Sequence, residues 1–260
     1  MVGHEGIIAP IASSLLVVQQ LIGEPRGGTS SADVDADLIQ STYGVVARHG
    51  RSPMPWVAIN MIQSIDGGIS VDGVSGPLGS AADKAVFRIL RSSAPVILVG
   101  AQTVRAEVYR PAACPIAVVT ATGDFGPAQA LRHDDRTLFL TTLDSPIRDV
   151  AGDQVIAVPA MEPALLGDTS KLAIDLRAAL IALASKGYSW VLCEGGPTLN
   201  GQLLELDLVD EICVSISPTA VGGSATRLAH SAHAVAHRFV LQSAIEHDSM
   251  LLLRYLRPLD

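Results

Sequence analysis

The chain has few cysteines, few positive charges and no long apolar runs. Its three cysteines, Cys114, Cys193 and Cys213, lie far apart with no Cys-x-x-Cys, which predicts buried thiols and neither a disulfide framework nor a zinc site. A formal net charge of −8 argues against a nucleic-acid surface, which needs a basic face. No apolar run approaches the roughly 18–20 residues of a membrane span. These absences favour a cytoplasmic protein with a small-molecule partner and no metal, nucleic acid or membrane.

The length of 260 residues suits one large α/β domain or two small ones. No linker or internal repeat divides the chain, so we expect one domain over residues 54–260. Residues 1–53 are expected to form an N-terminal arm and helix packed on that domain. Within them, Ile7–Val18 is interpreted as a strand or packing arm, because no Lys or Arg precedes Arg26 as a signal sequence requires, and Asp33–Val46 has helical spacing.

Short apolar runs bounded by Gly, Pro or Asp recur along the chain, and several are rich in β-branched residues, as strands are. They are Trp56–Asn60, Val96–Val99, Ile116–Thr120, Thr137–Thr141, Val155–Val158, Trp190–Cys193, Glu211–Ile216, Phe239–Gln242 and Met250–Tyr255. Helical spacing occurs at Ala81–Arg91, Leu172–Lys186 and Thr198–Leu206. Strand and helix alternate first, and the C-terminal part is mainly strands. The predicted fold class is α/β, with a mixed, mainly parallel sheet flanked by helices and an antiparallel edge.

The clearest local motif is a buried strand that runs directly into two glycines and then a helix, from Val191 to Leu199. Gly195 and Gly196 let backbone amides approach a ligand, and the helix start behind them presents free N–H groups to a phosphate. Glu194 stands beside them at the carboxyl end of the strand. Taken alone, the same pattern equally describes a tight strand–helix turn with a solvated Glu.

A second strand, glycine and helix start follow one another from Ile97 to Glu107, with Thr103 in the first helical turn. Ligands of open α/β sheets bind at the carboxyl ends of strands, so two such turns could hold the two ends of one dinucleotide. The Gly-x-Gly-x-x-Gly spacing of the Rossmann fold is absent. The alternative for Thr103 is a helix N-cap.

Four motifs in this order and spacing resemble one family: the reductase domain of the bacterial bifunctional riboflavin-pathway deaminase/reductase, and its single-domain pyrimidine-reductase-like relatives in particular. They are Ser64-Ile65-Asp66-Gly67, Arg91 followed by Val96 to Glu107, Glu194 to Leu199, and Val209-Asp210-Glu211 before Pro218 to Gly223. The resemblance covers roughly residues 54–257. The zinc deaminase signature is absent, so only the reductase half is represented.

The resemblance implies a dihydrofolate-reductase-like fold, NADPH as cofactor and a homodimer. It also implies reduction of a ribosylaminopyrimidine 5′-phosphate, in which the imine carbon of the ring-opened sugar accepts hydride. The cofactor residues that it implies are Thr103, Glu107, Gly195, Gly196, Pro197, Thr198 and Leu199, with Thr120 and Thr122 as weaker candidates near the adenosine 2′-phosphate. The substrate residues are Ser75, Arg91 and Glu194, and the two expected catalytic acids are Asp66 and Glu194.

Alternatives remain for several of these residues. Asp66 is equally suited to capping its own turn, and Arg91 either clamps a substrate phosphate or faces solvent. His230, His233 and His237 match no common metal-ligand spacing, and the dipeptide Asp210-Glu211 is interpreted as a structural charge pair at a strand edge.

The chain departs from the family pattern on the substrate side. Gly68 stands where the family has a basic residue, Pro77 lies near the position of a Trp, and Glu107-Val108-Tyr109 replaces an acidic residue followed by Asn or Asp and Pro. A second hypothesis therefore keeps the fold and cofactor and changes the substrate, for example to dihydrofolate. A third is a nucleotide-binding protein without turnover.

Overall fold

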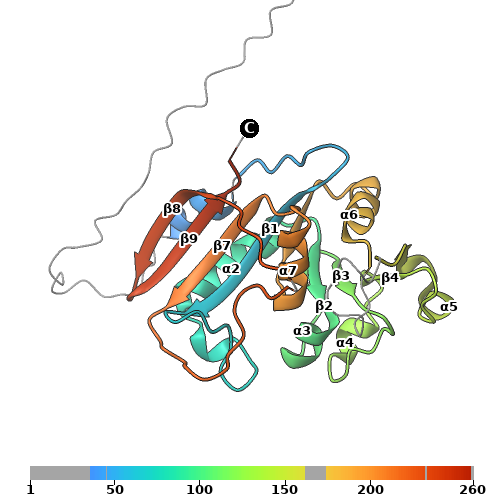
Figure 1. Cartoon of the computed structure of the whole chain (residues 1–260), viewed down its shortest axis with the longest axis horizontal. Helices are drawn as coiled ribbons and strands as arrows, with labels where there is room; N and C mark the ends of the chain where they lie inside the picture. The colour runs from blue at the N-terminus through green and yellow to red at the C-terminus, as the bar shows by residue number, and fades with distance from the viewer. Residues whose placement is uncertain (1–35, 45, 162–173, 232, 259–260) are drawn as a thin grey trace, which may run out of the picture.

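The computed structural model describes residues 36–44, 46–161, 174–231 and 233–258. These residues form a nine-stranded sheet in the order β5-β4-β3-β2-β6-β1-β7-β9-β8 (Figure 1). The strands are β1 (Trp56–Ser64), β2 (Ile97–Gly100), β3 (Ile116–Val119), β4 (Leu138–Thr142), β5 (Val155–Val158), β6 (Trp190–Cys193), β7 (Glu211–Ser217), β8 (Val240–His247) and β9 (Met250–Leu256). Neighbours from β5 to β7 pair in parallel, whereas β9 pairs antiparallel with β7 and β8. The predicted mixed sheet with an antiparallel edge is confirmed.

Helices cover both faces of this sheet. They are α1 (Ala36–Ile39), which continues as a π-helical turn (Gln40–Gly44), α2 (Ala81–Ser93), α3 (Ala101–Ala106), α4 (Gln129–Arg132), α5 (Arg148–Ala151), α6 (Leu176–Ser185) and α7 (Pro197–Glu205), with 3-10 turns at Gly76–Leu78 and Gly152–Gln154. Figure 1 shows α6 and α7 in front of the sheet and α2 behind it. Successive strand side chains point to opposite faces, so Ala58 packs in the layer of α2 and Ile59 in the layer of α6 and α7.

Local sequence explains the boundaries of two of these helices. The Ser80 hydroxyl accepts a hydrogen bond from the Asp83 amide at 3.2 Å and starts α2, which buries Val86 and Leu90 on one face. The Asp175 carboxylate accepts from the Ala178 amide at 2.9 Å and starts α6, later than the predicted start at Leu172. A capping side chain thus locates a helix start more sharply than apolar spacing does.

The nine strands expected from Trp56 onward are all present, with differences at their ends. β1 runs on to Ser64 and β8 to His247, because β7 and β9 offer continuous pairing partners beyond the apolar runs. The short helices α4 and α5 were not expected. The predicted strand or arm Ile7–Val18 lies outside the described residues, as do parts of the predicted helices that begin at Asp33 and Leu172.

A buried ion cluster joins the segment after α1 to the sheet. Glu211 at the start of β7 is 0% exposed and accepts hydrogen bonds from Arg48 at 2.8 and 2.9 Å and from Arg254 at 2.7 Å. The Trp56 indole N–H donates to the same carboxylate at 3.0 Å. The interpretation of Asp210-Glu211 as a strand-edge pair was wrong, because β7 lies inside the sheet and both side chains are buried.

Substitution Glu211→Gln is expected to lower the free energy of unfolding by about 3 kcal/mol, because two guanidinium groups lose their buried counter-charge. Urea unfolding followed by circular dichroism measures the loss. Asp134→Asn is the matched control, since Asp134 pairs with Arg136 at the surface, where an ion pair contributes little. Equal stability of the two variants would contradict a stabilising role for the buried cluster.

The ionisation of Glu211 also makes the stability of the fold depend on pH. Burial alone would raise the pKa of Glu211, but hydrogen bonds from Arg48 and Arg254 lower it from 4.5 to about 2. Its contribution is therefore present above pH 4.5 and is lost as the pH falls toward 2. Glu211→Gln removes this part of the pH dependence.

Candidate active site

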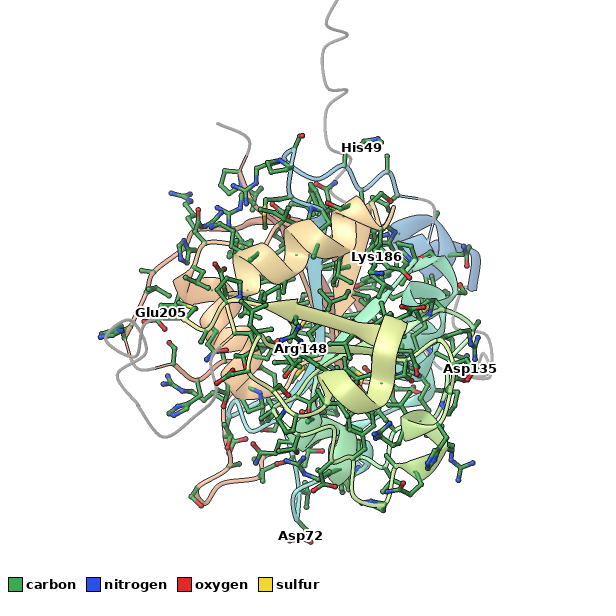
Figure 2. All side chains as sticks on the ribbon, turned by 90° about the vertical axis from the view of Figure 1, so that its right-hand side faces the viewer. His49, Asp72, Asp135, Arg148, Lys186 and Glu205 are labelled. Atoms are coloured by element: carbon green, nitrogen blue, oxygen red, sulfur yellow. The ribbon has the colours of Figure 1, made fainter. Side chains whose placement is uncertain are left out.

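A cavity of about 480 Å³ opens at the carboxyl ends of β1, β2 and β6. Its walls come from the second half of β1, helices α2 and α3, the first turn of α7 and the loop from Ile69 to Gly79. Figure 2 shows Asp72, within this loop, at the end of the molecule opposite His49, which precedes β1. Parallel pairing brings these strand ends together, as in other open α/β sheets.

Glu194 is the most enclosed charged side chain of the cavity wall, at 6% exposure. Arg91 donates to both of its carboxylate oxygens, from Nε at 2.7 Å and from Nη2 at 2.6 Å. The Tyr109 hydroxyl donates to Oε2 at 2.8 Å. The three side chains form one charge-assisted network at the wall.

The network defines protonation states for two of its members. Burial alone would lower the pKa of Arg91, but its hydrogen bonds and attraction to Glu194 outweigh burial and raise that pKa. Burial, and then the negative charge of Glu194, raise the pKa of Tyr109 well above its usual value. Arg91 is thus a cation and Tyr109 a neutral donor near pH 7, and both orient the Glu194 carboxylate.

The glycine turn after β6 lies directly against the turn after β2. The Gly100 amide donates to the Gly195 carbonyl at 2.8 Å, and the Gly195–Gly196 peptide bond is cis. Gly195 has φ +89°, in the region that favours glycine, and a Cβ on Gly196 would come within 2.5 Å of Thr103 Oγ1. Within the described residues no side chain caps α7, and since Pro197 has no N–H and the Asn200 amide donates to the Gly196 carbonyl, the amides of Thr198 and Leu199 are left for a ligand.

This arrangement fits the diphosphate of a dinucleotide. A side chain on Gly196 would collide with the Thr103 hydroxyl, so a glycine at this position allows the hydroxyl and the turn to lie together at the cavity wall. Gly196, Pro197, Thr198 and Leu199 line the cavity together with Thr103. Amides at a helix start, a hydroxyl and two glycines form the donor set that phosphate oxygens require.

Two loops lie on the other side of the cavity: the one from Ile69 to Gly79 and the one that contains Val221, Gly222 and Thr226. Asp66, just before the first loop, is hydrogen-bonded to the second. The exposed Asp66 carboxylate accepts from the Ser64 hydroxyl and from the amides of Val221 and Gly222 at 3.1 and 2.7 Å. These bonds, from Ser64 first, lower the pKa of Asp66 to about 2, so that it is ionised at neutral pH. Two of these three partners are backbone amides, so Asp66 ties the turn after β1 to the loop that contains Val221 and Gly222.

The structure brings together most of the residues expected from sequence. Eight line the cavity: Ser75, Thr103, Glu107, Glu194, Gly196, Pro197, Thr198 and Leu199. Ser75 and Glu107 contact one another, since the Ser75 amide donates to Glu107 Oε1 at 2.8 Å. Gly195 lies next to the lining, and Arg91 lies behind Glu194 with its side chain 23% exposed.

Asp66, Thr120 and Thr122 are not among the residues that line the cavity. Both threonines lie in the turn after β3, where Thr120 Oγ1 accepts from the Gly123 amide at 2.9 Å and Thr122 Oγ1 from the Asp124 amide at 3.3 Å. Arg105 donates to the Asp124 carbonyl at 2.8 Å, and Arg132 Nε lies 3.7 Å from the Cβ position of Gly123. Two arginines therefore flank this turn.

Sequence reasoning missed Asp83, Lys84, Phe87 and Tyr109, which also line the cavity. Two of these residues could have been predicted from their spacing. Asp83 and Phe87 lie eight and four residues before Arg91 on α2, so all three share one helix face. The Phe87 ring lies 4.2 Å from the Arg91 guanidinium carbon. Tyr109 had no such signal, since it enters the network from the loop after α3.

In the part of the chain that the structure describes, no helix is long and apolar enough to cross a membrane. The same residues contain no group of three or more His, Cys, Asp or Glu side chains placed to hold a metal ion.

The sheet, the glycine turns and the Glu194 network together define an α/β domain with a ligand cavity at the carboxyl ends of its parallel strands. The chain belongs to the RibD C-terminal domain family, whose family model matches residues 55–250.

Individual relatives agree with this membership. The chain is 27% identical over 183 residues to the 2,5-diamino-6-ribosylamino-4(3H)-pyrimidinone 5′-phosphate reductase of Methanothermobacter thermautotrophicus, covering 66% of this chain and 82% of that protein.

Two solved structures share the fold at lower identity. A pyrimidine reductase-like protein from Corynebacterium diphtheriae is 22% identical, with a TM-score of 0.64 and coverage of 85% of this chain and 99% of that one. A diaminohydroxyphosphoribosylaminopyrimidine deaminase/5-amino-6-(5-phosphoribosylamino)uracil reductase from Thermotoga maritima is 18% identical, with a TM-score of 0.58, covering 79% of this chain and 57% of that one.

Proposed function

We propose that this protein reduces a ribosylaminopyrimidine 5′-phosphate with NADPH, in a step of riboflavin biosynthesis. The single observation that carries the proposal is the placement of the Glu194 network and the glycine turn before α7 on the walls of one cavity. The family and the names of the relatives support the substrate class. Bound NADPH would supply the hydride, and the chain's own residues orient the substrate and handle charge.

Glu194 is proposed to act at the reacting imine. The imine would be reduced in its protonated form: hydride would form the C–H bond at the imine carbon, and the electron pair of the C=N π bond would move to nitrogen and cancel its positive charge. The product is a neutral amine N–H, so the positive charge is present only before the transfer. A carboxylate held by Arg91 and Tyr109 accepts a hydrogen bond from the protonated nitrogen and so stabilises its positive charge. The network keeps the carboxylate oriented before substrate enters.

The cations near the cavity divide between two tasks in this proposal. Arg91 gives two guanidinium N–H groups to Glu194, which makes it a positioning residue for that carboxylate. Lys84 is the one basic side chain among the described residues that line the cavity, and its positive charge would attract the anionic substrate and cofactor.

NADPH is proposed over NADH because of the turn after β3. Thr120 and Thr122 lie there between Arg105 and Arg132, which would give a 2′-phosphate hydroxyl and guanidinium partners. Thr103 and the first turn of α7 would hold the diphosphate. A homodimer in the cytoplasm completes the proposal, and the three free thiols are compatible with that compartment.

Two pyrimidines are candidates for the ring. The name of the Methanothermobacter enzyme specifies a 2-amino-pyrimidinone, and that of the Thermotoga protein a uracil, which has an oxygen in the same place. Dihydrofolate remains a second candidate substrate, because Gly68 and Pro77 depart from the family pattern on the substrate side.

The test is loss of NADPH absorbance with purified protein and each of these three substrates in parallel. We expect turnover of a ribosylaminopyrimidine phosphate, a higher kcat/KM with NADPH than with NADH, and no turnover of dihydrofolate. Reduction of dihydrofolate alone would move the protein to the second hypothesis. Binding of NADPH with no reduction of any of the three would contradict the proposed substrate.

Asp66→Ala is expected to raise KM roughly 5- to 20-fold while kcat changes less than about 3-fold, because Asp66 anchors the two loops over the cavity. Steady-state kinetics measures both constants. Asp72→Asn, an exposed change in the same loop at a residue with φ 50°, is the control and should leave both unchanged. A fall in kcat on the order of 100-fold at unchanged KM would restore the catalytic role expected from the resemblance.

A further inference from the structure

A second carboxylate lines the cavity and has no task in the reaction proposed above. Asp83 lies in the first turn of α2, on the same helix face as Phe87 and Arg91. Its carboxyl hydrogen-bonds with Ser215 of β7, which is 2% exposed, and its Oδ2 lies 3.5 Å from the Cβ position of Gly79. The group is held between the sheet and the cavity loop.

The Asp83 carboxylate is partly buried at the cavity wall. Burial raises the pKa of Asp83 above its ordinary value, and the bond to Ser215 and the charge of Lys84 only partly offset burial. Within the described residues, Asp83 forms no ion pair. A partly desolvated carboxylate is stabilised by N–H donors that a ligand brings.

The positions of Asp83, Phe87 and Arg91 along α2 indicate how a ligand in the cavity would be oriented. Asp83 and Arg91 are separated by two helical turns, roughly 12 Å along the axis, with Phe87 between them. Arg91 holds Glu194, at the end assigned to the reacting imine. A pyrimidine placed beside Phe87 has the atom bearing its ribosylamino group toward Glu194 and the opposite ring edge toward Asp83.

We propose that Asp83 selects the pyrimidine ring that carries a 2-amino group. This rests on the proposed function and deepens it. The ring edge opposite the ribosylamino group of a 2-amino-4(3H)-pyrimidinone presents two adjacent donors, the ring N3–H and the amino group. Two parallel N–H donors match the two oxygens of a carboxylate. A uracil presents one N–H beside a carbonyl oxygen, whose lone pairs face the carboxylate.

The test compares kcat/KM for 2,5-diamino-6-ribosylamino-4(3H)-pyrimidinone 5′-phosphate and 5-amino-6-(5-phosphoribosylamino)uracil. We expect the protein to prefer the 2-amino compound, and Asp83→Asn to lower this preference roughly 10- to 100-fold, because the amide places a donor where an acceptor was. Lys84→Gln is the control, expected to weaken both substrates alike and to leave their ratio unchanged.

A second measurement does not depend on the variant. Titration calorimetry of the unaltered protein with 2,6-diamino-4(3H)-pyrimidinone and with 6-aminouracil should show tighter binding of the diamino ring. Equal binding of the two rings, or an Asp83→Asn variant with an unchanged substrate ratio, would overturn the assignment of Asp83. Absence of turnover with both phosphates would instead overturn the proposed function, so the two failures are distinguishable.

Discussion

Glu194→Gln is expected to lower kcat/KM for the pyrimidine substrate on the order of 1000-fold, with NADPH affinity changed less than about 3-fold. The amide keeps the shape of the carboxylate and loses the charge that stabilises a protonated imine. It also replaces one acceptor of Arg91 by a donor, which disturbs the bidentate pair. Both consequences act on the reacting end of the cavity and not on the glycine turn.

Steady-state kinetics and NADPH fluorescence titration measure the two quantities. Tyr109→Phe is the matched control, because it removes one hydrogen bond to Glu194 and no charge, and it should cost only about 3- to 10-fold in kcat/KM. Thermal unfolding checks that each variant is folded. Full turnover by a folded Glu194→Gln variant would remove Glu194 from the mechanism.

Gly196→Val is expected to weaken NADPH binding on the order of 1000-fold. The new Cβ would meet Thr103 Oγ1 at 2.5 Å, and the branched side chain would occupy the space between the two strand ends. It would also keep a phosphate away from the amides at the start of α7. Neither the Glu194 network nor the substrate loops need to change for this loss.

Fluorescence titration with NADPH measures this affinity. Gly76→Ala is the control glycine: it lines the same cavity, has no heavy atom within 4 Å of its Cβ position, and should bind NADPH within about twofold of the unaltered protein. Unchanged NADPH affinity in a folded Gly196→Val variant would refute the phosphate-loop assignment.

Some of the site residues had strong local signals. The run of four apolar residues before Glu194, followed by Gly195 and Gly196, predicts a strand, a tight turn and a helix start from chemistry that is local in the chain. The structure has β6 and α7 in these places. Gly100 and Thr103 carried the same kind of signal after β2, and the order of the motifs identified the family.

Other residues could not be placed from the chain alone. Asp66 follows a strand and resembles a catalytic acid in sequence, but its partners are amides about 155 residues away in the chain. Tyr109 reaches Glu194 across 85 residues. Glu211 looked like a strand-edge charge until the sheet order placed β7 between β1 and β9 and brought Arg48 and Arg254 to it.

The sequence by itself determined the strands from Trp56 onward, the longer helices and the two glycine turns, because strand runs, helix starts and tight turns depend on residues close together in the chain. Only the tertiary structure decided which acids line a cavity, which carboxylates accept hydrogen bonds from loop amides and which ones pair with buried arginines. The pairing of β1 with β6 and of β2 with β6 joins segments that are far apart in sequence. This pairing decides which charged side chains of the site are buried and which of them lie close enough to form hydrogen bonds. No local sequence pattern specifies it.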